Sequence, residues 1–196
     1  MALYFVRHGQ TQNNLENRMN TGDDNDPLTE VGKSQAVQAG IDLKANEKIN
    51  INVIISSNLN RAKETAKIIA EQIGYDGKIY QDTRLREQDG GIFKGKKRDE
   101  IKSEYNLNSD YEFRKLFKNR ENNKKEDVTD FDQRVGEFLQ DMNINFSNAN
   151  ILLVGHSGTS RALLRNVQDL DFETTHFEMP GVKNAQVINL ETYGIV

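Results

Sequence analysis

Short apolar runs without polar alternation are the feature that most constrains the fold of this chain. They lie at residues 3–6, 53–55 and 151–154. Continuous runs of this length are typical of strands buried on both faces, as in a parallel sheet, whereas half-exposed strands alternate apolar and polar residues. A segment with helical character follows the second and third runs. The pattern therefore predicts an α/β fold with a mostly parallel central sheet.

Charged side chains follow these three runs. Arg7 and His8 come directly after the first, Arg61 follows the second, and His156 follows the third. Ligand sites in open α/β sheets lie just outside the carboxyl ends of the strands, so we expect these side chains to meet. His156 also stands at a strand-to-helix turn, where backbone N–H groups and the helix dipole favour an anion. One Arg-His pair alone usually lies on the surface without a function. Here arginine and histidine residues also follow the other two strands, and this recurrence predicts a phosphate site.

Capping residues and periodicity predict further elements. Thr29 is a candidate N-cap of a helix with a narrow stripe of small residues, and Gly74 is a candidate end for the helix that contains Arg61. The clearest helix spans residues 127–146, whose apolar side chains recur at steps of three and four. Residues 78–80 and 185–191 are interpreted as further strands.

Four sequence blocks, in order along the chain, resemble the motifs of the histidine phosphatase superfamily. They are RHGQTQNN at 7–14, SSNLNRAKETA at 56–66, LREQDGG at 85–91 and VGHSGTSR at 154–161. Residues 26–36 (DPLTEVGKSQA) also fit the entry to the family's first helix. The resemblance implies the phosphoglycerate mutase-like fold, a three-layer sandwich with helices on both faces of a mostly parallel sheet. It further implies one domain, residues 1–196, with residues 92–126 inserted as a helical cap.

The same resemblance implies a role for each matched residue. His8 is the expected nucleophile, because a neutral imidazole nitrogen can attack phosphorus and form a phosphohistidine. Glu87 is the expected proton donor and later the base. We expect the transferred phosphoryl group to contact Arg7, Arg61 and His156, the last as an imidazolium or as a neutral donor. The resemblance implies that these three side chains replace a metal ion. Further substrate-binding positions are Asn14, Thr21, Gly22 and Ser157.

Composition excludes several other classes of function. The chain has 26 basic and 30 acidic residues among 196, so its net charge of −4 does not predict nucleic acid binding. It has no cysteine, which excludes disulfides, thiol nucleophiles and zinc–thiolate sites. The first apolar run begins at residue 3, and no run approaches membrane-spanning length. We therefore expect a cytoplasmic protein with no membrane partner, no metal and no cofactor, and nothing in the sequence indicates an oligomeric state.

Several other features have an ordinary structural interpretation. His176 lies outside the motifs, and such a histidine is usually structural or exposed. Residues 94–98 (KGKKR) are interpreted as a solvated charge run rather than as a device that steers anions. Asp23, Asp24 and Asp26 lack the spacing of a calcium loop, so they do not predict a metal site.

The chain departs from its relatives at two places that bear on substrate choice. Gly90 and Gly91 follow Glu87 where many relatives have an aromatic residue. Many relatives also carry a Gly-Glu-Ser signature where the cap ends, and either Glu121 or Glu126 is a candidate for its glutamate.

The sequence leaves three functions open. The first is a metal-independent phosphomonoesterase that acts on a small phosphorylated metabolite and releases inorganic phosphate. The second is a cofactor-dependent phosphoglycerate mutase, which is less favoured because the cap shows no paired arginines. The third is a non-catalytic module that binds a phosphorylated ligand, although each of the expected catalytic residues is present.

Overall fold

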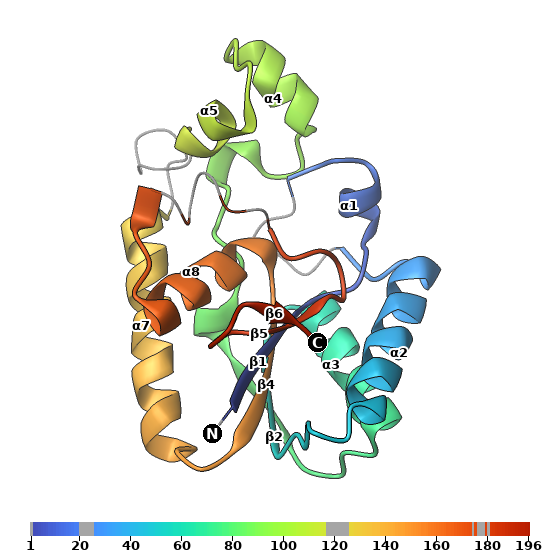
Figure 1. Cartoon of the computed structure of the whole chain (residues 1–196). Coiled ribbons are helices and arrows are strands. Elements are labelled where there is room, and N and C mark those ends of the chain that lie inside the picture. Colours follow the sequence, from blue (N-terminus) through green and yellow to red (C-terminus); the bar gives the residue numbers. More distant parts are fainter. Residues whose placement is uncertain (1, 20–25, 117–125, 174, 176–178, 180) are drawn as a thin grey trace.

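The central element of the protein is a six-stranded sheet in the order β3-β2-β4-β1-β5-β6. The computed structural model describes residues 2–19, 26–116, 126–173, 175, 179 and 181–196 (Figure 1). The four strands from β3 to β1 run parallel, and β5 and β6 add an antiparallel edge. The strands are β1 (Ala2–Arg7), β2 (Val53–Ser57), β3 (Ile79–Asp82), β4 (Asn150–Gly155), β5 (Val187–Asn189) and β6 (Gly194–Ile195).

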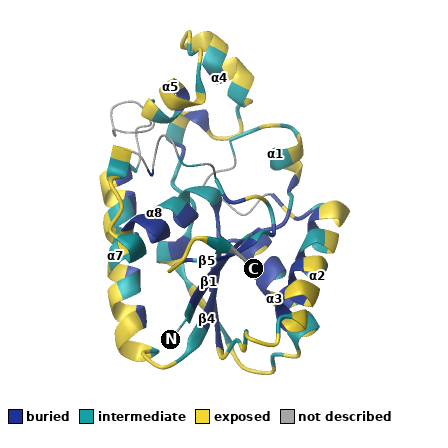
Figure 2. Cartoon of the chain, viewed as in Figure 1, coloured by how far each residue is buried: buried dark blue, intermediate teal, exposed yellow. Residues whose placement is uncertain are grey.

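Helices cover both faces of this sheet. Helices α2 (Glu30–Ala45) and α3 (Asn60–Ile73) lie on one side, and α7 (Val128–Asn145) and α8 (Ser157–Gln168) lie on the other (Figure 1). Each pair packs its own apolar core against the sheet. The predicted three-layer α/β fold is therefore confirmed, and Figure 2 shows its central strands β1 and β4 as mostly buried.

The predicted helix ends are also found. The Thr29 side chain accepts a hydrogen bond from the Gly32 amide at 3.0 Å, and Asp127 caps α7 in the same way. Gly74 ends α3 in the left-handed conformation, with a φ of 73° that glycine adopts without strain.

The two weaker strand predictions were right in type but wrong in extent. β3 begins one residue later than predicted and continues to Asp82, because its pairing with β2 extends that far. The final strand is much shorter than residues 185–191, because Ala185 has a φ of 52° and cannot belong to an extended strand.

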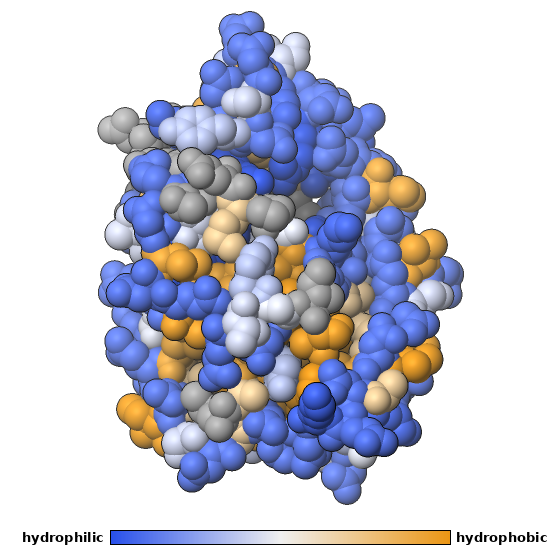
Figure 3. All heavy atoms as spheres, viewed as in Figure 1, coloured by the Kyte–Doolittle hydropathy of each residue, from blue (hydrophilic) through white to orange (hydrophobic). Residues whose placement is uncertain are grey.

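Short helices lie beyond the carboxyl ends of the parallel strands. They are α1 (Gln12–Leu15), α4 (Arg98–Glu104), α5 (Asp110–Lys115) and the 3-10 turns η1 (Thr83–Leu85) and η2 (Gly91–Phe93). Phe93, Ile101 and Phe113 form a small third core that holds α4 and α5 together. The surface over α4 and α5 is strongly hydrophilic in Figure 3. None of the helices in the described parts of the chain is long and apolar enough to cross a membrane.

Candidate active site

The register of β1 and β4 brings the two motif histidines together. Arg7 pairs with Gly155, and the His8 amide donates to the Gly155 carbonyl at 2.9 Å. His8 and His156 therefore leave neighbouring strands at the same level, and their ring centroids lie 5.1 Å apart. The prediction that these two strand ends lie side by side is confirmed.

A backbone carbonyl fixes the tautomer of His8. Its Nδ1 lies 2.7 Å from the Gly9 carbonyl oxygen. Because a carbonyl can only accept, Nδ1 carries the hydrogen and Nε2 keeps its lone pair. Burial, followed by the charges of Arg7 and Arg61, holds the pKa of His8 well below its usual value. The ring is therefore neutral at physiological pH, as a nucleophile must be.

The loop that carries His8 packs against the start of α2 through two glycines. A Cβ on Gly9 would overlap the Gly32 carbonyl, and a Cβ on Gly32 would overlap the Gln10 carbonyl. The Gly9 amide also donates to the Thr65 hydroxyl at 3.1 Å. Glycine in both motifs thus allows two backbones to approach closely and fixes the position of His8.

His156 is completely buried beside Ser57. Its Nε2 lies 2.9 Å from the Ser57 hydroxyl oxygen, and its Nδ1 has no hydrogen-bond partner among the described residues. Burial and the nearby Arg61 charge hold the pKa of His156 well below its usual value. Of the two forms considered from the sequence, the structure therefore favours the neutral donor over the imidazolium.

Two arginines complete the charge around these histidines. Arg61 extends from the first turn of α3 and is 1% exposed. Arg7 donates from Nη1 to the Val182 carbonyl at 3.1 Å. Burial lowers the pKa of Arg7 to about 10, which leaves the guanidinium charged at neutral pH. We call Arg7, His8, Arg61 and His156 the reacting end of the site.

Glu87 is held at the start of α8. Its carboxylate accepts from the backbone amides of Gln88 and Gly158, each at 3.0 Å. A Cβ at position 158 would overlap Glu87 Oε1, so glycine there is what admits the carboxylate. Glu87 is thereby fixed beside the reacting end, where its charge raises the pKa of Arg7 against the larger effect of burial.

Arg134 of α7 supports the segment that carries Glu87, and the sequence did not indicate it. It donates to the carbonyls of Arg84 and Arg86, and it forms an ion pair with Glu126 at 2.6 Å. Glu126 in turn accepts from the Asp89 amide at 3.1 Å. Of the two glutamates considered for the end of the cap, Glu126 therefore contacts the acid segment, and Glu121 lies outside the described residues.

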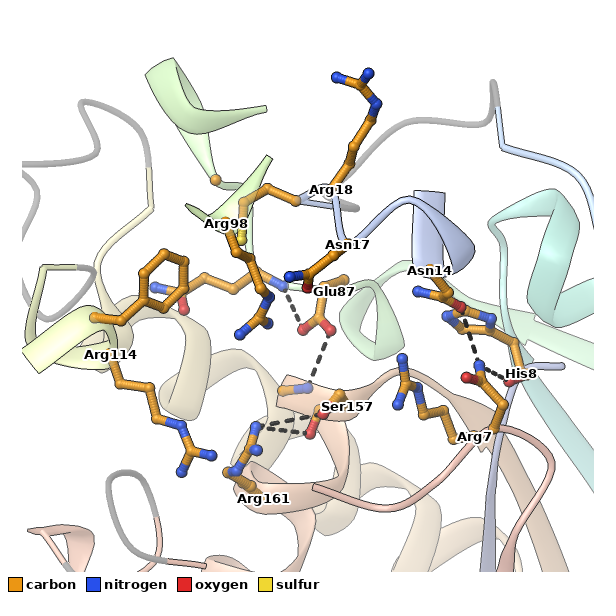
Figure 4. A pocket seen from close by; sticks show the side chains of 16 residues that line it. Arg7, His8, Asn14, Asn17, Arg18, Glu87, Arg98, Arg114, Ser157 and Arg161 are labelled. Atoms are coloured by element: carbon orange, nitrogen blue, oxygen red, sulfur yellow. Dashed lines mark hydrogen bonds between the residues drawn. The ribbon is translucent and has the colours of Figure 1, made fainter. Parts of the chain in front are cut away.

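A cavity of about 410 Å³ opens over these groups (Figure 4). Its volume lies within the range typical of small-molecule sites. Arg61 and His156 lie buried next to His8 and are not among the described residues of the cavity wall. The wall consists of Arg7, His8, Asn14, Asn17, Arg18, Met19, Glu87, Gln88, Gly90, Arg98, Phe113, Arg114, Ser157, Gly158, Arg161 and Asn184.

The further substrate-binding predictions have different outcomes. Asn14 and Ser157 line the cavity, whereas Thr21 and Gly22 lie outside the described residues, as does His176. Asn184, which the motifs did not indicate, donates from Nδ2 to the His8 carbonyl at 2.9 Å and to Asn14 Oδ1 at 3.0 Å. It links the turn before β5 to the loop that carries His8.

Three further arginines face the cavity on the other side of Glu87 (Figure 4). They are Arg98 of α4, Arg114 of α5 and Arg161 of α8, and we call them the distal end. The interpretation of residues 94–98 as a solvated run is wrong for Arg98, since α4 turns this side chain towards the cavity. The cap shows no adjacent arginines in the sequence, but its fold brings Arg98 and Arg114 to the same cavity.

Among the described residues, there is no metal site near Asp26. No group of three potential ligands lies close enough together to hold an ion in those parts of the chain. Asp26 is buried and accepts from the Asn13 amide at 3.1 Å, while Asp23 and Asp24 lie outside the described residues. Asp26 thus has a structural contact that accounts for it.

Neutral histidines, arginines and a carboxyl group thus gather at the ends of parallel strands, an arrangement whose charges suit a phosphoryl group. A family model for the histidine phosphatase superfamily (branch 1) matches residues 3–194, and the chain belongs to this family. Relatives and structural neighbours of the chain have names of both phosphatases and mutases.

Individual relatives carry both kinds of name. A protein of Salmonella choleraesuis named "Probable phosphoglycerate mutase GpmB" is 42% identical over 104 residues, which are 53% of this chain and 46% of that protein. The match thus spans less than half the length of this curated relative. Among solved structures, Bacillus stearothermophilus YhfR is 31% identical with a TM-score of 0.80, covering 95% of this chain and 88% of its own. A mycobacterial glucosyl-3-phosphoglycerate phosphatase with bound VO3 is 26% identical, with a TM-score of 0.79 and coverages of 95% and 90%.

Proposed function

We propose that this protein is a metal-independent phosphomonoester hydrolase that acts on a small phosphorylated metabolite through a phosphohistidine at His8. The observation that carries the proposal is the setting of His8: its Nδ1 is held by the Gly9 carbonyl, which leaves the lone pair on Nε2, and the buried ring lies beside Arg7 and Arg61. A cavity of about 410 Å³ supports a small substrate rather than a protein.

The first step transfers the phosphoryl group to the enzyme. Glu87 takes up a proton beside the anionic phosphate of the bound substrate. His8 Nε2 attacks phosphorus, the bond from phosphorus to the ester oxygen breaks, and the protonated Glu87 gives that oxygen its proton. Arg7, Arg61 and His156 stabilise the charge on the transferred group, and Asn14 and Ser157 border it. Phosphoryl transfer needs mainly positioning and positive charge, so these groups suffice without a metal.

The second step releases phosphate. Glu87, now a carboxylate, takes a proton from water, and the resulting oxygen attacks the phosphorus of phosphohistidine. The N–P bond breaks, and the electron pair returns to His8 Nε2. Inorganic phosphate leaves, and the enzyme regains its starting state.

The second candidate function is a phosphoglycerate mutase, in which phosphohistidine gives its group to a substrate hydroxyl instead of water. The specific observation that favours it is the pair of cap arginines, Arg98 and Arg114, at the cavity. The names of two relatives are consistent with it, GpmB and a phosphoglycerate mutase from Bacillus anthracis that is 27% identical with a TM-score of 0.79.

One experiment separates the candidates. Purified protein is incubated with a panel of phosphorylated metabolites, and both inorganic phosphate and isomerised phosphoglycerate are measured. We expect phosphate release, undiminished by exhaustive EDTA. Isomerisation without phosphate release would instead establish the mutase, and no turnover of any ester would leave only a binding module. Complete loss in EDTA, restored by Mg²⁺ or Mn²⁺, would contradict the metal-independent mechanism.

A further inference from the structure

Among the described residues, the ring of His156 has one hydrogen-bond partner, the side chain of Ser57. The Ser57 Oγ lies 2.9 Å from His156 Nε2, and both residues are 0% exposed. Ser57 ends β2, and His156 directly follows β4. Because β2 and β4 are paired in parallel, their carboxyl ends lie side by side. The pairing of the strands therefore holds the serine against this histidine.

The other contacts of the Ser57 hydroxyl indicate which atom carries the hydrogen of this bond. A hydroxyl has one hydrogen to donate and two lone pairs that accept. The Leu59 amide donates to Ser57 Oγ at 3.3 Å and uses one of these lone pairs. Among the described residues, His156 Nε2 is the one acceptor within reach of the hydroxyl hydrogen. Ser57 therefore donates to Nε2, and the hydrogen of the neutral imidazole lies on Nδ1.

The alternative tautomer would leave more buried groups unpaired. If Nε2 carried the hydrogen, Ser57 Oγ would accept it, and the hydroxyl hydrogen would have no acceptor among the described residues. The lone pair of His156 Nδ1 would also be unpaired, since this buried nitrogen has no partner in the described parts of the chain. Buried polar groups without partners are costly, so the contacts favour the form with the hydrogen on Nδ1.

The hydrogen on His156 Nδ1 then lacks an acceptor within the protein as described. The ring of His156 lies 5.1 Å from the ring of His8, measured between centroids. In the proposed function His8 Nε2 carries the phosphoryl group, whose oxygens enter the space beside the His156 ring. A neutral N–H donates to an anionic oxygen, whereas a lone pair at the same position would repel it. An oxygen of the phosphoryl group is thus the acceptor that this buried donor fits.

We propose that Ser57 is a positioning residue that fixes the tautomer of His156, so that Nδ1–H donates a hydrogen bond to the transferred phosphoryl group. This inference rests on the proposed function for the group that accepts the hydrogen. The two histidines are then the same tautomer but present opposite nitrogens. His8 presents the lone pair of Nε2, because the Gly9 carbonyl binds its Nδ1–H, and His156 presents Nδ1–H, because the Ser57 hydroxyl binds its Nε2.

Nitrogen-15 NMR of the histidine rings reports the tautomer without turnover. The chain has three histidines, and the His8→Ala and His156→Asn variants assign the two rings of the site. We expect the wild-type His156 ring to carry its hydrogen on Nδ1, and Ser57→Ala to shift it towards the Nε2–H form. A wild-type ring with its hydrogen on Nε2, or an unchanged tautomer in Ser57→Ala, would overturn the proposal.

Ser56→Ala is the matched control. Ser56 precedes Ser57 in β2 and is also 0% exposed, but its hydroxyl donates to the Ser57 carbonyl at 3.0 Å. Both substitutions remove one buried hydroxyl from the same strand, so a general loss of stability would affect the two variants alike. The tautomer of His156 should be that of the wild type in Ser56→Ala.

Inorganic phosphate probes the donor itself. In calorimetry, Ser57→Ala should raise the Kd of phosphate by about 10-fold, because a hydrogen bond to a charged group is weakened. Ser56→Ala should leave the Kd unchanged. Since Ser57 acts through His156, the double variant Ser57→Ala/His156→Asn should bind phosphate no more weakly than His156→Asn alone. Additive losses, equal weakening in both serine variants, or no phosphate binding by the wild type would refute the proposed role.

Failure of this inference and failure of the proposed function are distinguishable. The NMR and binding measurements need no chemical step, so they would uphold the role of Ser57 even if no ester were hydrolysed. In single-turnover phosphorylation of His8, Ser57→Ala should slow 4-nitrophenyl phosphate and an alkyl phosphate alike, by about 10-fold, because it acts on the transferred group. Wild-type rates in Ser57→Ala would refute its role and leave the proposed function intact.

Discussion

The reacting end of the site is built from residues at the ends of central strands, whereas the distal end is built mainly from short helices beyond the sheet. His8 and His156 are 3% and 0% exposed and take their positions from the register of two parallel strands. Arg98 and Arg114 are only partly buried, and the small core around Phe113 sets their positions. The positions of the proposed catalytic residues therefore depend on the central strands, whereas those of the distal arginines of α4 and α5 depend on the packing of two short helices.

The largest expected effect is a loss of kcat caused by a substitution at the reacting end. His8→Ala removes the proposed nucleophile, and we expect kcat to fall by at least about 10⁴-fold for every ester. Initial rates with 4-nitrophenyl phosphate and with an alkyl phosphate measure the loss. Circular dichroism should show an unchanged fold. A folded variant that keeps substantial activity would show that His8 is not the nucleophile.

Glu87 stands between the two ends, and its effect should depend on the leaving group. In single-turnover phosphorylation of His8, Glu87→Gln should slow alkyl esters by about 10²–10⁴-fold, because their oxygens need a proton. A nitrophenolate departs without much help, so its transfer should suffer less. Arg61→Ala should harm both esters alike, by about 10²–10³-fold, since it stabilises the transferred group. Equal losses for both esters in the Glu87 variant would indicate Asp89 as the acid instead.

Arg134 offers a smaller test of how the acid is positioned. Arg134→Met removes the ion pair to Glu126 and the donors to the Glu87 segment. We expect kcat for alkyl phosphates to fall by about 10-fold, with a smaller loss for 4-nitrophenyl phosphate. Arg165→Met is the matched control, because Arg165 pairs with Asp132 between α7 and α8. A similar kcat loss in both variants, or no difference between esters, would leave Arg134 with a merely structural role.

The smallest expected effect is on stability, and it arises at the reacting end. The pKa values of buried His8 and His156 lie well below 6.5, so the unfolded chain binds more protons than the folded one at mildly acidic pH. The free energy of unfolding should therefore decrease as pH falls below about 6.5, by about 1.4 kcal/mol per pH unit for each histidine. The distal guanidinium groups stay charged throughout this range. Urea unfolding between pH 7 and 5 measures the slope, which His156→Asn should reduce; an unchanged slope would contradict the neutral state of His156.

The reacting end could be predicted from the sequence because each of its residues stands next to a local signal. Arg7 and His8 directly follow an apolar run, His156 follows another after one glycine, and Arg61 lies in the first turn of a helix with a clear apolar stripe. Parallel pairing then brings these strand ends together whatever the rest of the chain does. Local signals also predicted the layers, the helix ends at Thr29 and Gly74, and the helix over residues 127–146.

The distal end could not be predicted because its arginines meet only through tertiary packing. Arg98 closes a lysine-rich run that is otherwise solvated, and only the orientation of α4 turns it inward. Arg114 and Arg161 share the Met179 carbonyl, which lies far from Arg114 in the sequence. Asn184 and Arg134 were missed for the same reason, since their partners are brought near by the fold and not by spacing.

The most direct test of a phosphohistidine at His8 is to trap the phosphorylated enzyme. A substrate labelled in its phosphoryl group is mixed with excess enzyme and quenched in alkali within one turnover, and the protein is digested for peptide mapping. We expect an acid-labile, alkali-stable label on the peptide that contains His8, absent from the His8→Ala variant. Labelled phosphate released without any protein-bound intermediate, or a label on another residue, would contradict it.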